Sequence, residues 1–254
     1  MPTSVDRDEL IAFLDDVLDA EGDDYGPNGL QVEGRREIEK VVTGVSSCLE
    51  LFERAEEVGA QAVMVHHGIF WYGMPYPLTG VQYRRTAVLV RAGISLIAYH
   101  LPLDRHPELG NNAIAAKQFG LVDREPFGEA KGQPVGFAGR FPEPVPLRDL
   151  LSRCFQVYGQ EPLAFTAGPD PVSSLGIISG GGQKDLHRAI DTGLDAYVTG
   201  EASEWVMNLA REAGIHYLAA GHYATERLGI RALGEHVAKR FGVEVEFVDV
   251  PNPV

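Results

Sequence analysis

Apolar residues recur along the chain at two spacings, one typical of amphipathic helices and one typical of buried strands. Near the N-terminus five apolar residues follow helical spacing: Leu10, Phe13, Leu14, Val17 and Leu18. Asp6 precedes them with Glu9 three residues later, which is a capping-box pattern, and Gly22 marks the end of the helix. A polar loop rich in turn residues follows.

Short apolar runs then alternate with helical patterns over most of the chain. In the first half, strands are predicted at 41–45, 62–65 and 94–99, and helices at 48–58, 83–92 and 111–119. In the second half, strands are predicted at 175–179, 195–199, 215–219 and 243–250, and helices at 183–191, 202–212 and 223–240. Strands separated by helices of about ten residues indicate βαβ crossovers, so an α/β fold with mostly parallel sheets is expected.

Residues 126–171 interrupt this alternation. They hold eight of the 16 prolines, and only one strand (135–141) and one helix (147–158) are predicted there. We interpret this Pro-rich stretch as a connecting region. The chain is therefore expected to form two α/β lobes, residues 1–130 and 131–254, with an approximate boundary.

The charge and the length of the apolar runs argue against two classes of binding partner, duplex nucleic acids and membranes. The chain has 22 Lys and Arg against 36 Asp and Glu, a formal net charge of −14, which argues against broad binding of duplex nucleic acid. The apolar runs stay shorter than the roughly 18 residues of a membrane span, so no membrane partner is expected. The acidic N-terminus does not resemble a targeting peptide, and Cys48 and Cys154 lie far apart. These features predict a cytoplasmic protein with reduced thiols.

Histidines and carboxylates gather where predicted strands end. His66 and His67 follow one strand, and His100 follows the next. Three acidic residues and one further histidine occupy related positions: Asp104, Glu201, His222 and Glu226. In open parallel α/β sheets, ligands bind outside the carboxyl ends of the strands, so this shared position favours a functional site.

The spacing of these residues suits divalent metal ions. His222 and Glu226 are four residues apart and would share one face of a helix. The adjacent His66 and His67 would point to opposite sides of an extended backbone, so they serve two ions more naturally than one. With Asp104 or Glu226 bridging, the set predicts two divalent ions per chain, of Zn, Mn, Fe, Co or Ni.

Each motif also has a simpler interpretation. A His-His pair after a strand is often only a polar loop, and a His and a Glu four residues apart are often a surface pair. Gly180, Gly181 and Gly182 precede a predicted helix, where their N–H groups would bind a phosphate of the substrate or simply form a tight turn. The sequence lacks a GxSxG motif, which argues against an α/β-hydrolase.

Several longer runs resemble one known family. AVMVHHGIFW, YHLPLDRHPELGNNAIAA and AAGHYATERLGIRALGE are similar to YbgI-type members of the Nif-three-like family, also labelled GTP cyclohydrolase I type 2 homologues. The resemblance implies two interlinked α/β lobes with a dinuclear metal site in the cleft between them, and a toroidal homohexamer. The family's metal ligands match five residues here: His66, His67, Asp104, His222 and Glu226.

The resemblance and the residues together predict a metal-dependent hydrolase of nucleotide-like substrates, with GTP cyclohydrolase-type ring opening as the specific activity. Metal ions would activate water at neutral pH for attack on the guanine ring. His100, at the edge of the site, and Glu201 are the candidates for moving protons. The alternative is a metal-binding, metal-delivery or assembly protein without turnover of its own.

Overall fold

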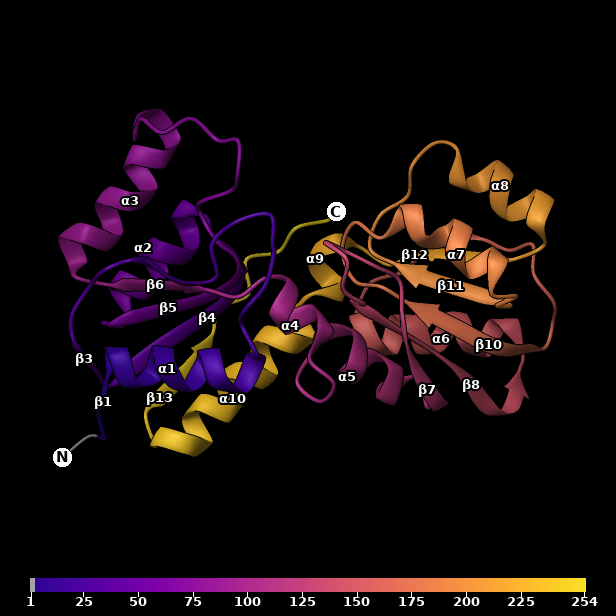
Figure 1. Cartoon of the computed structure of the whole chain (residues 1–254), viewed down its shortest axis with the longest axis horizontal. Helices are drawn as coiled ribbons and strands as arrows, with labels where there is room; N and C mark the ends of the chain where they lie inside the picture. Colours follow the sequence, from indigo (N-terminus) through magenta and orange to yellow (C-terminus); the bar gives the residue numbers. More distant parts are fainter. Residues whose placement is uncertain (1–2) are drawn as a thin grey trace. The chain divides into compact units, whose positions relative to one another are not determined.

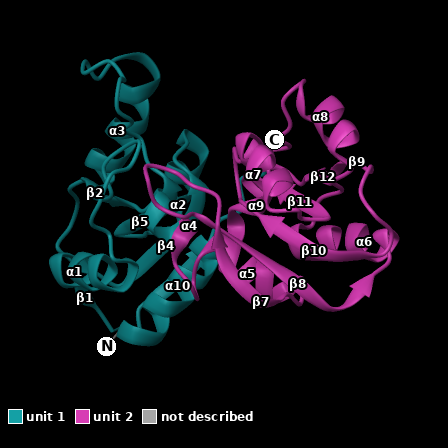
Figure 2. Cartoon of the chain, turned by 45° about the vertical axis from the view of Figure 1, so that its right-hand side comes forward, with its two compact units in different colours: residues 1–103, 229–251 teal, residues 104–228, 252–254 magenta. Residues whose placement is uncertain are grey.

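The computed structural model describes residues 3–254, which form two compact units coloured separately in Figure 2. The first unit runs to Leu103 and includes Gly229–Pro251, and the second consists of Asp104–Leu228 with Asn252–Val254. Within the described residues, no helix combines the length and the apolar character needed to cross a membrane.

The first unit is built on a five-stranded sheet with the strand order β13-β4-β5-β6-β2 (Figure 1). Its strands are β2 (Gly29–Val32), β4 (Lys40–Ser46), β5 (Ala62–His67), β6 (Ser95–Ala98) and β13 (Glu244–Phe247). All neighbours are parallel except β2, which is antiparallel to β6. A separate antiparallel pair joins β1 (Val5–Asp6) to β3 (Glu37–Ile38).

Helices cover both faces of this sheet. They are α1 (Arg7–Leu18), α2 (Leu49–Glu57), α3 (Gly80–Ala92) and most of α10 (Arg227–Phe241). Val42 of β4 belongs to the same buried cluster as Phe52 of α2 and Leu89 of α3. On the other face, a Cβ at Gly234 of α10 would lie 3.0 Å from the side chain of Thr43. Two covered faces explain why these strands are continuously apolar.

The first predicted helix is confirmed as α1. Asp6 is its N-cap, and its carboxylate accepts hydrogen bonds from the N–H groups of Asp8 and Glu9. These bonds satisfy two of the N–H groups that a helix leaves without a partner in its first turn.

The second unit contains a six-stranded mixed sheet with the order β7-β8-β10-β11-β12-β9. Its strands are β7 (Val122–Phe127), β8 (Gly136–Val145), β9 (Leu163–Phe165), β10 (Val172–Ile177), β11 (Ala196–Thr199) and β12 (His216–Ala219). Strands β10, β11 and β12 run parallel, and the outer strands pair antiparallel. The helical segments are α5 (Asn111–Gln118), α6 (Leu147–Tyr158), the 3₁₀ turn η1 (Gln183–Asp185), α7 (Leu186–Asp191), α8 (Val206–Ala213) and α9 (His222–Thr225). The short α4 (Leu101–Arg105) carries the chain from the first unit into the second.

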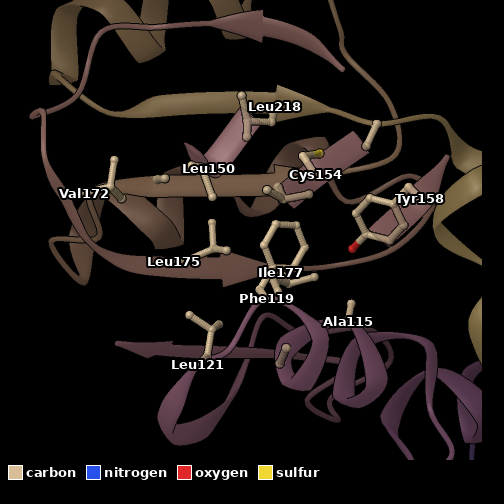
Figure 3. Close-up of a cluster of buried hydrophobic side chains, with 14 of the residues drawn as sticks. Ala115, Phe119, Leu121, Leu150, Cys154, Tyr158, Val172, Leu175, Ile177 and Leu218 are labelled. Atoms are coloured by element: carbon tan, nitrogen blue, oxygen red, sulfur yellow. The ribbon is translucent and has the colours of Figure 1, made fainter. Parts of the chain in front are cut away.

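The core of the second unit lies between its sheet and the helices α5 and α6 (Figure 3). Phe119 follows α5, and Leu150 and Tyr158 belong to α6. They pack with Leu175 and Ile177 of β10, and all five are almost fully buried.

The α/β fold class is confirmed, but the units differ from the predicted lobes 1–130 and 131–254. The chain enters the second unit at Asp104 and returns to the first at Gly229, because β13 pairs with β4 of the first sheet. Residues 126–171 are not a connecting region, since β8 pairs with both β7 and β10. The second sheet is mixed rather than mostly parallel, because β7, β8 and β9 form antiparallel pairs.

We expect Phe119→Ala to lower the free energy of unfolding by about 3–5 kcal/mol, because it leaves a cavity in this core. Phe155→Ala is the matched control, since Phe155 lies on α6 with 45% of its surface exposed. The control should cost about 0.5 kcal/mol. Urea denaturation followed by circular dichroism measures both, and equal losses would contradict the assignment of Phe119 to the core.

Candidate metal centre

Three imidazoles of the first unit gather at the end of two neighbouring strands. His66 and His67 are the last residues of β5, rather than the first after it as predicted, and His100 lies two residues beyond β6. Strands β5 and β6 are parallel, so both deliver their histidines to the same edge. The ring centroids lie 4.6 Å (His66 to His67), 5.0 Å (His66 to His100) and 5.5 Å (His67 to His100) apart. One nitrogen of each ring lies within 4.8 Å of the others, which is compatible with a shared metal ion.

Hydrogen bonds to Nδ1 orient these rings. Nδ1 of His66 donates to the backbone oxygen of Tyr99 at 3.0 Å, and Nδ1 of His100 donates to Oδ1 of Asp24 at 2.6 Å. Since both partners accept here, each neutral ring carries its proton on Nδ1 and its lone pair on Nε2. Nδ1 of His67 lies 3.0 Å from Oγ of Ser46. Metal-binding imidazoles are commonly held in this way by a partner on the second nitrogen.

Asp24, which the sequence analysis did not identify, holds the surroundings of His100. Besides His100, its carboxylate accepts hydrogen bonds from N–H of Tyr25 and Leu101 and from Nδ2 of Asn28, at 2.6–3.0 Å. Burial alone would raise the pKa of Asp24, but the hydrogen bond and charge of His100 and the other donors outweigh it and lower that pKa. Asp24 therefore stays ionised and fixes both the loop before β2 and the start of α4.

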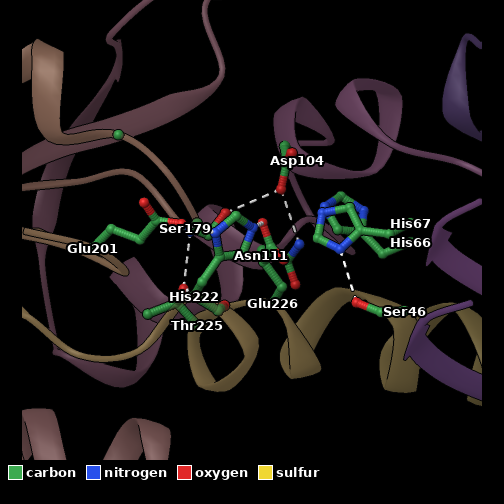
Figure 4. Close-up of polar contacts among 12 residues, drawn as sticks. Ser46, His66, His67, Asp104, Asn111, Ser179, Glu201, His222, Thr225 and Glu226 are labelled. Atoms are coloured by element: carbon green, nitrogen blue, oxygen red, sulfur yellow. Dashed lines mark hydrogen bonds and ion pairs between the residues drawn. The ribbon is translucent and has the colours of Figure 1, made fainter. Parts of the chain in front are cut away.

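In the second unit, Asp104 offers a buried carboxylate (Figure 4). Its Oδ1 accepts hydrogen bonds from Nδ2 of Asn111 at 2.9 Å and from Oγ of Ser179 at 3.0 Å. Asn112, also on α5, accepts a 2.7 Å hydrogen bond from N–H of Ser179. These contacts hold the carboxylate of Asp104 in one position.

His222 lies between two carboxylates of the same unit. Its Nδ1 donates to Oε1 of Glu201 at 2.6 Å, and its Nε2 lies 3.2 Å from Oε1 of Glu226. A carboxylate oxygen of Glu226 also lies within 4.8 Å of one of Asp104. The continuous helix predicted over 223–240 is wrong, because α9 ends at Thr225 and Glu226 lies between α9 and α10. The two side chains nevertheless meet.

The carboxylates change the protonation of His222. Burial disfavours its charged form, but the hydrogen bonds and charges of Glu226 and Glu201 outweigh burial and raise its pKa to about 9. In the absence of metal, His222 is therefore an imidazolium at neutral pH. Glu201, predicted as a proton carrier, here orients His222 as a hydrogen-bond acceptor.

The glycine run after β10 gives these side chains their space. Gly180 has a φ of +63°, and a Cβ there would lie 2.2 Å from Oε1 of Glu226 and 3.0 Å from Nε2 of His222. The N–H groups of Gly180 and Gly182 donate to the hydroxyls of Thr225 and Thr199. Two of the three N–H groups predicted to bind phosphate are thus already engaged, which supports the tight-turn interpretation. Substrate binding by Gly181 stays a prediction.

The other four histidines have different surroundings. His106 accepts hydrogen bonds from N–H groups of its own turn, and His216 contacts the backbone oxygen of Pro169. His187 and His236 each stack on an aromatic ring. None of them belongs to a potential metal-binding group among the described residues.

Comparison with known proteins identifies the family. A family model described as DUF34/NIF3 (NGG1p interacting factor 3) matches residues 5–253. The chain belongs to the NIF3 family. Among curated NIF3 relatives, a "GTP cyclohydrolase 1 type 2 homolog" of Pseudomonas aeruginosa is 43% identical over 245 residues, covering 96% of this chain and 97% of the relative. A relative of the same name from Vibrio cholerae is 44% identical over 254 residues, covering 97% and 98%.

Solved NIF3 structures share the fold. The structure of "protein ybgI, unknown function" has a TM-score of 0.93 and 41% identity, covering 98% of this chain and all of that one. A crystal structure from Thermus thermophilus has a TM-score of 0.90 and 39% identity with the same coverage. The predicted resemblance is therefore confirmed.

The donor set of this NIF3 chain fits a divalent metal. Imidazole nitrogens held through Nδ1 and buried carboxylates such as those of Asp104 and Glu226 are ligands that Zn, Mn, Fe, Co and Ni accept. Clusters of these side chains could bind a metal ion. The assignment of the five individual ligands stays a prediction from the sequence.

We expect Gly180→Ala to lower both metal content and stability, because its Cβ would displace Glu226 and His222. Gly193→Ala is the matched control, since Gly193 has a similar φ of +71° and nothing within 4 Å of its Cβ position. In both variants an alanine must adopt a positive φ, which costs about 1 kcal/mol of stability. Only the Cβ at position 180 would also collide with Glu226 and His222. Elemental analysis and urea denaturation compare them, and equal metal contents would contradict the prediction.

We expect the imidazole of His222 in metal-free protein to titrate near pH 9, and an NMR titration of its ring protons would measure this. The stabilisation from its raised pKa is present below the ordinary pKa of about 6.5 and is lost as pH rises through about 9. Glu201→Gln should lower this pKa, whereas Glu204→Gln, at an exposed neighbour, should leave it unchanged. A bound ion must displace the same proton, so metal affinity should decrease as the pH is lowered. The decrease should be steepest below about pH 6, because the three histidine ligands must each be unprotonated. Titration of His222 near 6.5 would show that the two carboxylates do not control its protonation.

Proposed function

We propose that this chain is a metal-dependent hydrolase that acts on nucleotide-like substrates, with GTP cyclohydrolase-type ring opening as the specific activity. The observation that carries the proposal is the imidazole cluster of His66, His67 and His100, whose donor atoms lie within 4.8 Å of one another. The name shared by the curated relatives supports the choice of substrate class.

Five residues would hold two divalent ions: His66, His67, Asp104, His222 and Glu226. When bound, these ions would lower the pKa of water and so provide a nucleophile at neutral pH. The proposal therefore makes metal content depend on residues of each compact unit. His67→Ala and His222→Ala should therefore each lower metal content.

The remaining polar residues act on the imidazoles and on protons. Asp24 keeps the proton of His100 on Nδ1, so Nε2 can accept a proton from the attacking water. Glu201 holds His222 through Nδ1 and thereby orients Nε2. Asn111 and Ser179 hold Asp104 in place. Each of these roles needs only hydrogen bonds within one unit.

We expect Glu226→Gln to remain folded but to lose at least one ion and most activity. The substitution keeps the shape of the side chain and removes a buried negative charge. His236→Ala is the control, because His236 stacks on Phe13 at 5.5 Å and has no role in the proposed site. Metal analysis and GTP turnover by metal-loaded protein measure the effects, and chelator should abolish turnover.

Two outcomes would change the proposal. Full metal content and turnover in Glu226→Gln would remove Glu226 from the ligand set. If metal-loaded protein binds ions but converts neither GTP nor other nucleotides, the function becomes that of a metal-binding or metal-delivery protein. Assembly into a toroidal homohexamer stays a prediction of the family resemblance, which light scattering would test.

A further inference from the structure

Exposed aromatic side chains of the first unit lie in two segments beside the imidazole cluster. Tyr25 precedes β2 and is 47% exposed, and Tyr72 and Tyr76 follow β5 with 72% and 99% exposed. Trp71, in the same segment, is partly exposed. Residues 68–83 contain no charged side chain, in a protein with a net charge of −14. The segment 68–83 beside the imidazoles therefore presents aromatic side chains and no charged ones.

The two segments are fixed to each other. N–H of Tyr72 donates to the backbone oxygen of Tyr25 at 2.8 Å. Gln31 joins them as well, because its Nε2 donates to the backbone oxygen of Pro27 and its Oε1 accepts from N–H of Ile69, both at 2.8 Å. The aromatic rings are thus presented by a connected backbone, which reduces the entropy lost when a ligand binds.

Two of these rings contact His100. The ring centroid of Trp71 lies 5.1 Å from that of His100 in an edge-to-face arrangement, and Tyr25 lies 6.1 Å from it. Trp71 also lies 5.8 Å from the ring of His67. A planar group held against Trp71 or Tyr25 would therefore be next to imidazoles that the proposed function places at the reaction.

We propose that Trp71 and Tyr25 form a subsite that binds the planar heteroaromatic ring of the substrate by stacking. This inference rests on the proposed function for the identity of the ring as a purine. Stacking of a base on an aromatic side chain needs no charge on the protein, and it is worth about 1–3 kcal/mol per base, or about 5- to 150-fold in affinity. An acidic protein can thus hold a nucleotide by its ring, beside a segment that carries no negative side chain.

Fluorescence can test this subsite separately from catalysis. The chain has two tryptophans, so Trp205→Phe leaves Trp71 as the only one. In this variant we expect guanosine to quench the fluorescence saturably and ribose to have no effect. Neither probe carries a phosphate, so binding of phosphate to metal ions does not contribute.

Variants measured by calorimetry give the matched comparison. Trp71→Leu should bind guanosine about tenfold more weakly, Tyr25→Ala should also weaken binding, and Trp71→Phe should retain most affinity. Tyr76→Ala should bind as the parent does, because Tyr76 lies in the same segment but is not part of the proposed subsite of Trp71 and Tyr25. Metal content should remain unchanged in all four variants.

The outcomes separate the subsite from the proposed function. Unchanged guanosine affinity in Trp71→Leu, or no guanosine binding by the parent, would overturn the subsite. Loss of metal in Trp71→Leu would also overturn it, because Trp71 would then act by packing the imidazoles. Guanosine binding that depends on Trp71, without any turnover of GTP, would support the subsite and count against the proposed hydrolase.

Discussion

The imidazole cluster depends on the parallel pairing of β5 with β6. The register places Val65 opposite Ala98, and N–H of Tyr99 extends the pairing by donating to the backbone oxygen of Val65. The backbone oxygen of the same Tyr99 then accepts the Nδ1 proton of His66. One stretch of sheet thus brings the histidines together and also sets which nitrogen of His66 carries the lone pair.

Carboxylate–imidazole pairs recur in both units, with different electrostatic results. Asp24 is surrounded by hydrogen-bond donors, so the pKa of its carboxyl group is lowered. The ionised carboxylate of Asp24 orients the ring of His100. His222 is surrounded by acceptors, so its pKa is raised and the metal-free ring carries a proton. The first arrangement fixes the proton on Nδ1 of His100, whereas the second stores a positive charge where a cation is proposed to bind. A divalent ion bound at His222, as proposed, would replace the proton on this ring.

The sequence could point to these histidines and carboxylates because strand ends are visible in a single chain. A short apolar run followed by His-His or by a Gly and Glu marks its position without knowledge of any distant partner. Asp24 could not be found in this way, because its contact with His100 joins residues 76 positions apart. Its loop has no apolar periodicity, so nothing local distinguishes Asp24 from Asp23.

The errors in predicting the fold from the sequence have the same origin, namely contacts between residues far apart along the chain. Strands β7 and β9 were missed because β7 carries charges and a proline, and β9 has only three residues. Their pairing with β8 and β12 depends on distant residues. The continuous helix over 223–240 was expected because its sequence is compatible with helix on both sides of Glu226. The break that moves Glu226 out of α9 leaves no mark in the pattern of apolar residues.

The return of the chain to the first unit has a consequence for synthesis. Strand β4 lies between β5 and β13, yet about 200 residues separate β4 from β13 along the chain. At about 5–20 residues per second, a ribosome needs roughly 10–40 s to make that stretch. During this time the sheet of the first unit has an open edge at β4, where another nascent chain could pair. A chaperone that covers this edge would therefore act during synthesis, before β13 is made.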